Sequence, residues 1–198
     1  MHARYVVKDV FYKKAKKEGF RARSAYKLEE MQQRFTLIKK GDRVLDLGAA
    51  PGGWLQKESA LVGARGFVIG LDILQMEPLP LSNLVLRTGD IRDLHVTDFL
   101  AELAIPSFDV VTSDIAPNLS GVREVDHANM MDLYQAVMRV VKEGLKKGGN
   151  FLVKVFVSPE FKDMTSDLKP AFVSVITFKP KASRDVSSEV YLVCTGKR

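Results

Sequence analysis

A lysine stands in the middle of an apolar run in the C-terminal quarter of the chain. In the segment FLVKVF, Lys154 is flanked on both sides by Val and Phe, a pattern typical of a buried strand. Lysine is almost never fully buried without a partner, and Asp114, which ends the run FDVVTSD, could supply the counter-charge. A buried ion pair would explain both residues structurally. Two such groups at the ligand-binding edge of a sheet instead favour proton chemistry.

The stretch VLDLGAAPGGW is a second chemical signal. A strand-like run that carries Asp46 breaks into a turn with three glycines and a proline, and a helix-like segment follows from Trp54. Strand, glycine turn and helix bring backbone N–H groups against a nucleotide-like ligand. The spacing differs from the dinucleotide fingerprint, and no phosphate-binding lysine followed by Ser or Thr is present. We therefore predict the cofactor turn of a class I S-adenosylmethionine (SAM) methyltransferase; the alternative is a tight turn without a ligand.

Two more aspartates follow strand-like runs, where doubly wound sheets bind their ligands. Asp72 lies 20 residues after Gly52 and could accept hydrogen bonds from both ribose hydroxyls. Asp90 follows the next run and could accept from the adenine amino group. Asp46 is better placed behind the turn or near the cofactor's ammonium group. Each aspartate alone could be a helix cap or a loop residue. NAD sites also use an acid after the second strand, so the sequence of the glycine turn must distinguish a SAM site from an NAD site.

The elements that would position these residues alternate along the chain. Strand-like patterns lie at 43–48, 67–73, 83–87, 108–114, 150–156, 172–179 and 187–195. Helix-like patterns lie at 5–18, 23–34, 53–62, 97–104, 124–147 and 159–168. The alternation predicts an α/β fold of the class I SAM-dependent methyltransferase (Rossmann-like) type, with helices on both faces of a seven-stranded sheet. The last connection is too short for a crossover, so we expect six parallel strands and one antiparallel strand.

Composition limits the class of protein further. The chain has 198 residues, of which 46% are hydrophobic and 27% charged, and is most simply one domain. No apolar run approaches the roughly 18 residues of a membrane span, and the N-terminus has no signal-peptide pattern. A single cysteine, Cys194, fits a reducing cytoplasm. Three scattered histidines predict no metal site.

The net charge of +6 is unevenly distributed. Residues 1–43 hold 13 Lys and Arg against 5 Asp and Glu, whereas the remaining chain holds 17 against 19. A basic helical arm at about 1–40 on a near-neutral body predicts a polyanion-binding face, with nucleic acid as the first candidate. The alternative is a solvated helix surface. The candidate RNA-binding residues are Lys13, Lys14, Lys17, Arg21 and Arg23.

Together the motifs resemble those of the FtsJ-type (RrmJ-like) family of RNA ribose 2′-O-methyltransferases. The matching segments are RARSAYKLEEM, LDLGAAPGGWLQ, GLDI, GDIRD, VVTSDIAPNLSG, LVKVF and SSEVYLV, in this order along nearly the whole chain. The resemblance implies a catalytic tetrad of Lys27, Asp114, Lys154 and Glu189. It implies cofactor contacts at Gly52, Trp54, Asp72, Asp90 and Asp114.

The resemblance also implies SAM as cofactor, S-adenosylhomocysteine as product and no metal. The short form looks like a monomeric cytoplasmic enzyme that methylates a uridine of large-subunit (23S-type) ribosomal RNA, within the large ribosomal subunit. Cap and transfer-RNA members share the tetrad, so transfer RNA or another RNA is an alternative substrate. Two other hypotheses are a SAM enzyme for small molecules or protein nitrogen and a catalytically silent RNA-binding module. The latter should have lost tetrad or turn residues, and all are present.

The implied chemistry depends on the lysine. A ribose 2′-hydroxyl is a poor nucleophile until its proton is being removed, and a free lysine, with a pKa of about 10.4, is mostly protonated at neutral pH. Burial and a neighbouring Lys27 would lower the pKa of Lys154, whereas Asp114 and Glu189 would oppose this shift. Lys154 could therefore act as a base or as a positioner. In-line alignment of hydroxyl, methyl group and sulfur could provide most of the rate.

Overall fold

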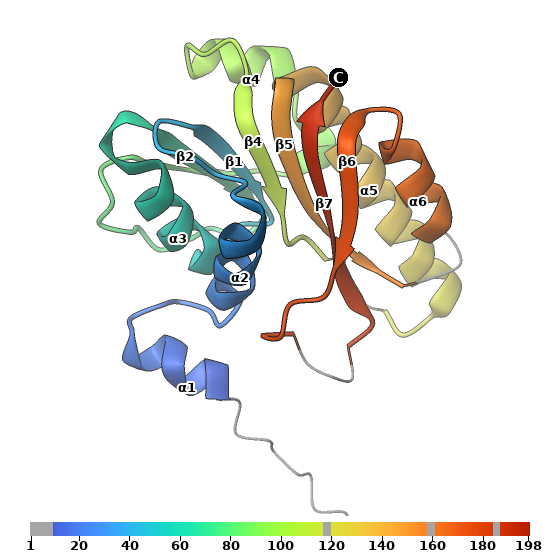
Figure 1. The fold of residues 1–198 in the computed structure, drawn as a ribbon, viewed down its shortest axis with the longest axis horizontal. Helices are drawn as coiled ribbons and strands as arrows, with labels where there is room; N and C mark the ends of the chain where they lie inside the picture. Colours follow the sequence, from blue (N-terminus) through green and yellow to red (C-terminus); the bar gives the residue numbers. More distant parts are fainter. Residues whose placement is uncertain (1–9, 117–119, 158–160, 184–186) are drawn as a thin grey trace, which may run out of the picture.

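The structure is a computed structural model that describes residues 10–116, 120–157, 161–183 and 187–198. One seven-stranded sheet, in the order β3-β2-β1-β4-β5-β7-β6, runs through this part of the chain (Figure 1). Its strands are β1 (Arg43–Leu47), β2 (Phe67–Asp72), β3 (Leu84–Thr88), β4 (Phe108–Ser113), β5 (Leu145–Phe156), β6 (Phe172–Phe178) and β7 (Glu189–Lys197). β7 is antiparallel to β5 and β6, and the other neighbours are parallel. The expected six parallel strands and one antiparallel strand are confirmed.

Helices cover both faces of the sheet (Figure 1). They are α1 (Val10–Lys17), α2 (Ala25–Phe35), α3 (Gly53–Val62), α4 (Val96–Glu102), α5 (Arg123–Gly144) and α6 (Phe161–Leu168), with short 3-10 turns η1 (Gly63–Arg65) and η2 (Ile91–Asp93). One core packs α2 and α3 against the sheet, and the other packs α4, α5 and α6. Because β4 lies between both cores, all its residues are buried, including the polar residues Asp109, Thr112 and Ser113.

The boundary between α5 and β5 differs from the expectation of a helix to residue 147. The helix ends at Gly144, and the strand begins at Leu145. Leu145 is 3% exposed and pairs with Phe108 of β4. Lys146 Nζ lies 2.5 Å from Asp109 Oδ1. These partners on β4 stabilise an extended backbone, so the helical prediction for 145–147 was wrong.

The N-terminal arm is attached to the body by a small apolar cluster. Ala15 of α1, Tyr26 of α2 and Ala182 of the β6–β7 connection are all buried in it, and Phe11 and Phe20 pack against them. The expected helix at 5–18 is described only from Val10, and residues 1–9 lie outside the described part. The cluster fixes α1 near the carboxyl ends of the parallel strands (Figure 1).

Candidate active site

The two predicted lysines and two predicted acids form ion pairs at the carboxyl ends of the parallel strands. Lys154 Nζ, on β5, lies 3.2 Å from Asp114 Oδ1, directly after β4. The same amine donates to the Asp114 carbonyl oxygen at 2.5 Å. On the other side, Lys27 of α2 is paired with Glu189 at the start of β7. The structure thus brings together the four residues that the resemblance implied.

Tyr191 joins these two ion pairs into one network. Its hydroxyl donates to Asp114 Oδ1 at 2.7 Å and accepts from Lys27 Nζ at 3.3 Å. The tyrosine is fully buried and pairs directly with Lys154 across the two strands. Sequence analysis missed Tyr191. The signal was available, because alternation along a strand places it on the same face as Glu189, two residues earlier.

The surroundings of the network define the charge of two of its members. Burial by itself raises the pKa of Glu189, but the hydrogen bond and charge of Lys27 outweigh it and hold the pKa below its usual range. Glu189 is therefore a carboxylate at neutral pH. Burial and the nearby Asp114 raise the pKa of Tyr191 well above its ordinary value. The tyrosine therefore keeps its proton and acts as a hydrogen-bond donor.

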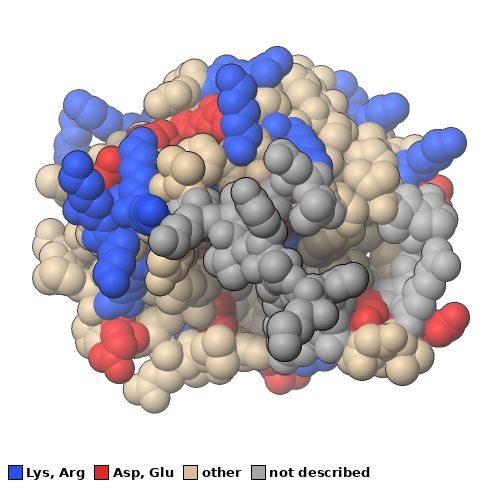
Figure 2. All heavy atoms as spheres, turned by 90° about the horizontal axis from the view of Figure 1, so that it is seen from below, with Lys and Arg blue, Asp and Glu red and all other residues tan. Residues whose placement is uncertain are grey.

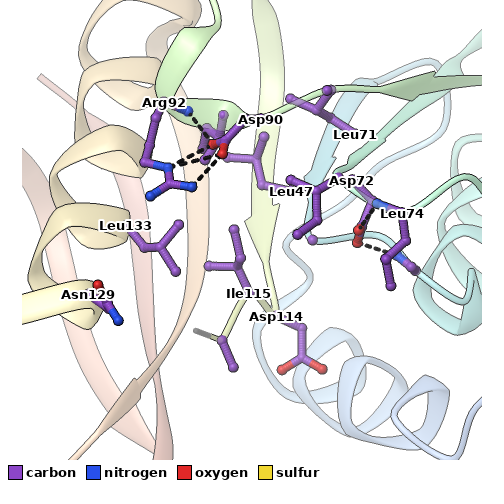
Figure 3. Close-up of a pocket in the computed structure, with 16 residues that line it drawn as sticks. Leu47, Leu71, Asp72, Leu74, Asp90, Arg92, Asp114, Ile115, Asn129 and Leu133 are labelled. Carbon is purple, nitrogen blue, oxygen red and sulfur yellow. Dashed lines mark hydrogen bonds and ion pairs between the residues drawn. The ribbon is translucent and has the colours of Figure 1, made fainter. Parts of the chain in front are cut away.

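A cavity of about 420 Å³ opens beside this network, between the ends of the strands and α5 (Figure 3). The glycine turn contributes Gly48 and Ala50 to its wall, and Asp72, Asp90 and Asp114 contribute carboxylates. Gly48 has a φ of 74°, and a Cβ there would lie 2.8 Å from the Ile115 backbone. Asp114 belongs to both the cavity wall and the lysine network. The cavity and the ion pairs therefore adjoin at Asp114.

Backbone N–H groups orient the Asp72 carboxylate. Oδ2 accepts from Ala50 N in the glycine turn, and Oδ1 accepts from Leu74 N in the loop after β2, each at 2.8 Å (Figure 3). Each carboxylate oxygen can accept a second hydrogen bond. The side chain is therefore fixed and can still accept the two hydrogen bonds predicted from ribose hydroxyls.

Asp90 is also at the cavity, where it is paired with Arg92 (Figure 3). It accepts from the Arg92 backbone N at 2.9 Å and from the guanidinium through both oxygens. These hydrogen bonds hold the pKa of Asp90 below its usual range. Arg92 itself lines the cavity and was not singled out from the sequence. Its position two residues after Asp90, in GDIRD, was the available signal.

Gly52 and Trp54 lie outside the cavity wall. Gly52 has a φ of 105°, and a Cβ there would face Leu79 and Arg21. The Trp54 indole N–H donates to the Ser24 carbonyl oxygen at 2.8 Å. Its ring lies 5.9 Å from that of Tyr191. Trp54 thus packs the glycine turn against the network, and its predicted contact with a cofactor stays a prediction.

Asp46 lies behind the turn in a buried pair of carboxyl groups. Asp46 and Glu58 of α3 are 1% and 0% exposed. Thr112 Oγ1 lies 2.8 Å from Glu58 Oε1 and 3.2 Å from Asp46 Oδ1. The second oxygen of each carboxyl has no hydrogen-bond partner in the described part of the chain. Burial raises the pKa of Glu58 to about 8, and burial and the adjacent Glu58 raise that of Asp46 well above its usual value.

Some basic side chains of the arm are exposed, and Arg21 is hydrogen-bonded within the protein. Lys13, Lys14 and Lys17 of α1 are exposed. Lys14 Nζ lies 4.5 Å from the centre of the Tyr26 ring. Arg21, between α1 and α2, instead donates to three backbone carbonyls. Figure 2, which views the molecule from below, shows Lys and Arg side chains at the left of this face and along its upper part.

Two kinds of feature are not found among the residues that the structure describes. No three His, Cys, Asp or Glu side chains are grouped closely enough to hold a metal ion. No helix in this part is both long enough and apolar enough to span a bilayer.

The strand order, the reversed β7 and the glycine turn after β1 define a Rossmann-type methyltransferase fold. Residues 20–197 match the family described as FtsJ-like methyltransferase, and the chain belongs to this family. The resemblance drawn from the motifs is therefore confirmed at the level of the family.

Similar proteins come from archaea, bacteria and a eukaryote. The chain is 47% identical to ribosomal RNA large subunit methyltransferase E of Archaeoglobus fulgidus, over 96% of this chain and 95% of that protein. It is 40% identical to the protein of the same name from Bdellovibrio bacteriovorus, over 98% and 99%. The crystal structure of a protein assigned as a ribosomal RNA methyltransferase from Plasmodium falciparum superposes with a TM-score of 0.77, at 28% identity, covering 90% of this chain and 98% of that one.

Proposed function

We propose that the protein transfers a methyl group from SAM to the ribose 2′-hydroxyl of RNA, with a uridine of large-subunit (23S-type) ribosomal RNA as the target. The observation that carries this proposal is the network of Lys154, Asp114, Tyr191, Lys27 and Glu189, which adjoins the cavity through Asp114. Relatives named for ribosomal RNA methylation support the choice of substrate.

The cavity fits the cofactor in size and in chemistry. Its volume of about 420 Å³ falls within the range of small-molecule sites. Asp72 would accept from the ribose, Asp90 from the adenine, and Asp114 would lie near the methionine end. When bound, SAM supplies an electrophilic methyl group. Gly52 and Trp54, which do not line the cavity, would support the cofactor site by shaping the glycine turn and the start of α3.

Lys154 has one position left for the substrate hydroxyl. Two of the three substituent positions on Nζ face Asp114, through the carbonyl oxygen and Oδ1. In the ammonium form the third position is an N–H that orients the hydroxyl oxygen. In the neutral amine it is the lone pair that accepts the hydroxyl proton. Either way, Asp114 aims that position, and Tyr191, which accepts from Lys27, holds the Asp114 carboxylate in place.

The arm would hold the RNA backbone. Exposed Lys13, Lys14 and Lys17 lie on α1, which packs on α2, the helix that carries Lys27. Phosphate contacts fix the register of a nucleic acid without reading its sequence. The arm would therefore orient the RNA while the network selects one ribose. We propose that the chain acts as one methyltransferase domain over 1–198 with this arm at about 1–40, as a cytoplasmic monomer on the large ribosomal subunit.

Mass mapping of RNA from cells with and without the gene tests the proposal. We expect loss of a single ribose methylation in large-subunit ribosomal RNA, with restoration by the intact gene and not by a Lys154→Ala version. Loss of a ribose mark in transfer RNA alone would favour the alternative substrate. Loss of a base methylation, or of no mark at all, would contradict the proposed function.

A further inference from the structure

Arg21 joins to the arm two segments that each contribute residues to the cavity wall, the glycine turn and the loop after β2. Its Nη1 donates to the Glu77 carbonyl oxygen at 2.6 Å and to that of Pro51 at 3.3 Å. Its Nη2 donates to the Pro78 carbonyl oxygen at 2.8 Å. Pro51 belongs to the glycine turn, whereas Glu77 and Pro78 belong to the loop between β2 and β3. One side chain therefore spans the junction between the turn and this loop.

Asp72 spans the same junction from the other side. Its carboxylate accepts from Ala50 N in the turn and from Leu74 N in the loop. Ala50 is the direct neighbour of Pro51, whose carbonyl Arg21 contacts. The two side chains thus fix the turn and the loop relative to each other, one through N–H groups and one through carbonyls.

The segment around Arg21 is also packed on the start of α3. Arg21 N donates to Gln56 Oε1 at 2.9 Å, and Gln56 Nε2 donates to the Gly19 carbonyl oxygen at 2.9 Å. A Cβ on Gly53 would lie 2.9 Å from Ala22 Cβ, so only glycine allows this approach. The backbone of Arg21 is therefore held, and its guanidinium is directed at the junction.

We propose that Arg21 is a positioning residue of the cofactor site, which sets the junction that orients Asp72, rather than a contact for RNA phosphate. This inference rests on the proposed function, since it assigns a role toward SAM. Lysine cannot replace arginine here. The guanidinium offers separate nitrogens in a rigid fork that reaches carbonyls on two segments, whereas the lysine amine offers all its donors at one point.

Calorimetric titration with SAM and with S-adenosylhomocysteine, together with RNA binding over a series of salt concentrations, tests the role of Arg21. We expect Arg21→Lys to raise the Kd of both compounds by roughly fivefold, because the fork is lost. The slope of log K for RNA against log salt should stay unchanged. Arg21→Ala should weaken SAM binding at least as much, also with an unchanged slope. In turnover, the KM for SAM should rise more than kcat falls.

Two matched variants separate this role from loss of charge alone. Arg65→Ala removes an exposed arginine of η1 and should leave the Kd for SAM and the salt slope unchanged. Lys17→Ala should reduce the salt slope by about 0.7 to 0.9 and leave the Kd for SAM unchanged. If Arg21→Ala does not fold, Arg21→Lys, which keeps the charge, decides the question.

Two results would overturn the assignment of Arg21. One is a wild-type Kd for SAM in both Arg21 variants. The other is a loss of salt slope in Arg21→Ala equal to that of Lys17→Ala. Failure of the wild-type protein to bind either SAM or S-adenosylhomocysteine would instead overturn the proposed function on which the inference rests.

Discussion

Lys154 of β5 and Tyr191 of β7 are paired directly across the two antiparallel strands, and both contact Oδ1 of Asp114. The antiparallel strand is therefore part of the site, because it delivers the tyrosine that links Asp114 to Lys27. If β7 were parallel to β5, its first residue, Glu189, would lie at the amino ends of the parallel strands, far from Lys27. The reversed strand is thus needed for the network to form.

Replacement of Tyr191 by phenylalanine tests the link. We expect the single-turnover rate of methyl transfer to fall roughly tenfold, because Asp114 and Lys27 lose their shared hydrogen-bond partner in a buried setting. The Kd for SAM should stay within a few-fold of the wild type, since the ring still packs on Trp54. Tyr12→Phe, at an exposed tyrosine, is the control. An unchanged rate in Tyr191→Phe would show that the hydroxyl is not needed.

Two alanine variants should separate catalysis from cofactor binding. Lys154→Ala should abolish turnover and leave the Kd for SAM within a few-fold of the wild type, because Lys154 does not line the cavity. The main effect of Asp72→Ala should be weaker SAM binding, because the substitution removes the oriented carboxylate of the cavity wall. Calorimetry and single-turnover assays measure the two effects. Equal losses of SAM affinity in both variants would contradict these roles.

The buried carboxyl pair predicts a pH dependence of stability. Burial raises the pKa of Glu58 from 4.5 to about 8, so the folded protein holds a proton that the unfolded chain releases between these values. The free energy of unfolding should therefore fall as pH rises through this window, by up to about 1.4 kcal/mol per pH unit for one proton. Urea unfolding of the wild type and of Glu58→Gln at pH 5 to about 8 measures it.

The amide of Glu58→Gln cannot ionise, so the free energy of unfolding of this variant should change less with pH. At the alkaline end of the range the variant should be more stable than the wild type. Glu102→Gln, at an exposed glutamate of α4, should follow the wild-type profile. If the free energies of unfolding of Glu58→Gln and the wild type changed with pH in the same way, Glu58 would not hold the proton in the folded protein.

The arm predicts a salt-dependent contribution to RNA binding. Changing Lys13, Lys14 and Lys17 together to alanine should weaken binding to RNAs of different sequence alike. The slope of log K against log salt should fall by roughly two units if all three side chains contact phosphate. SAM affinity should be unaffected, because the three side chains lie outside the cavity. The free energy of unfolding should fall by no more than about 1 kcal/mol, because Lys14 contacts the Tyr26 ring and Glu18 at the surface.

A matched control removes the same charge near the amino ends of the parallel strands, at the opposite end of the sheet from the arm. Its three alanines replace the exposed residues Lys142, Lys147 and Lys169. We expect this control to keep the wild-type slope. An unchanged slope in the arm variant would show that the basic helix is only a solvated surface, and the RNA groove would then have to be sought near the β6–β7 connection.

The sequence predicts the fold and the Lys154–Asp114 pair from signals local to the chain, whereas Lys27 and Glu189 were implied by the family resemblance. Strand and helix periodicities define the alternation, and Lys154 is conspicuous within an apolar run. The error at Leu145 has a tertiary cause, since its pairing with Phe108 overrides the helical pattern. Glu58 was missed although it shares the buried stripe of α3 with Leu55 and Val62, at helical spacing.

Other features depend on neighbours far apart in the sequence. The role of Tyr191 depends on Asp114 and Lys27, which are 77 and 164 residues away. Arg21 was grouped with the RNA-binding residues from its charge, and only the fold shows its carbonyl partners at Glu77 and elsewhere. Charge in the sequence therefore predicts a basic face but does not separate phosphate contacts from structural ones.

Methyl transfer to a substrate that lacks the target hydroxyl tests the central claim most directly. The purified protein is incubated with methyl-labelled SAM and large-subunit ribosomal RNA, or a subunit carrying it. A matched RNA carries a 2′-deoxynucleotide at the position identified by mapping. We predict label in the RNA with the ribose 2′-hydroxyl, at that nucleotide, and none there in the deoxy substrate. Equal labelling of the two substrates would place the methyl group on the base and contradict the account, as would the absence of transfer to any RNA.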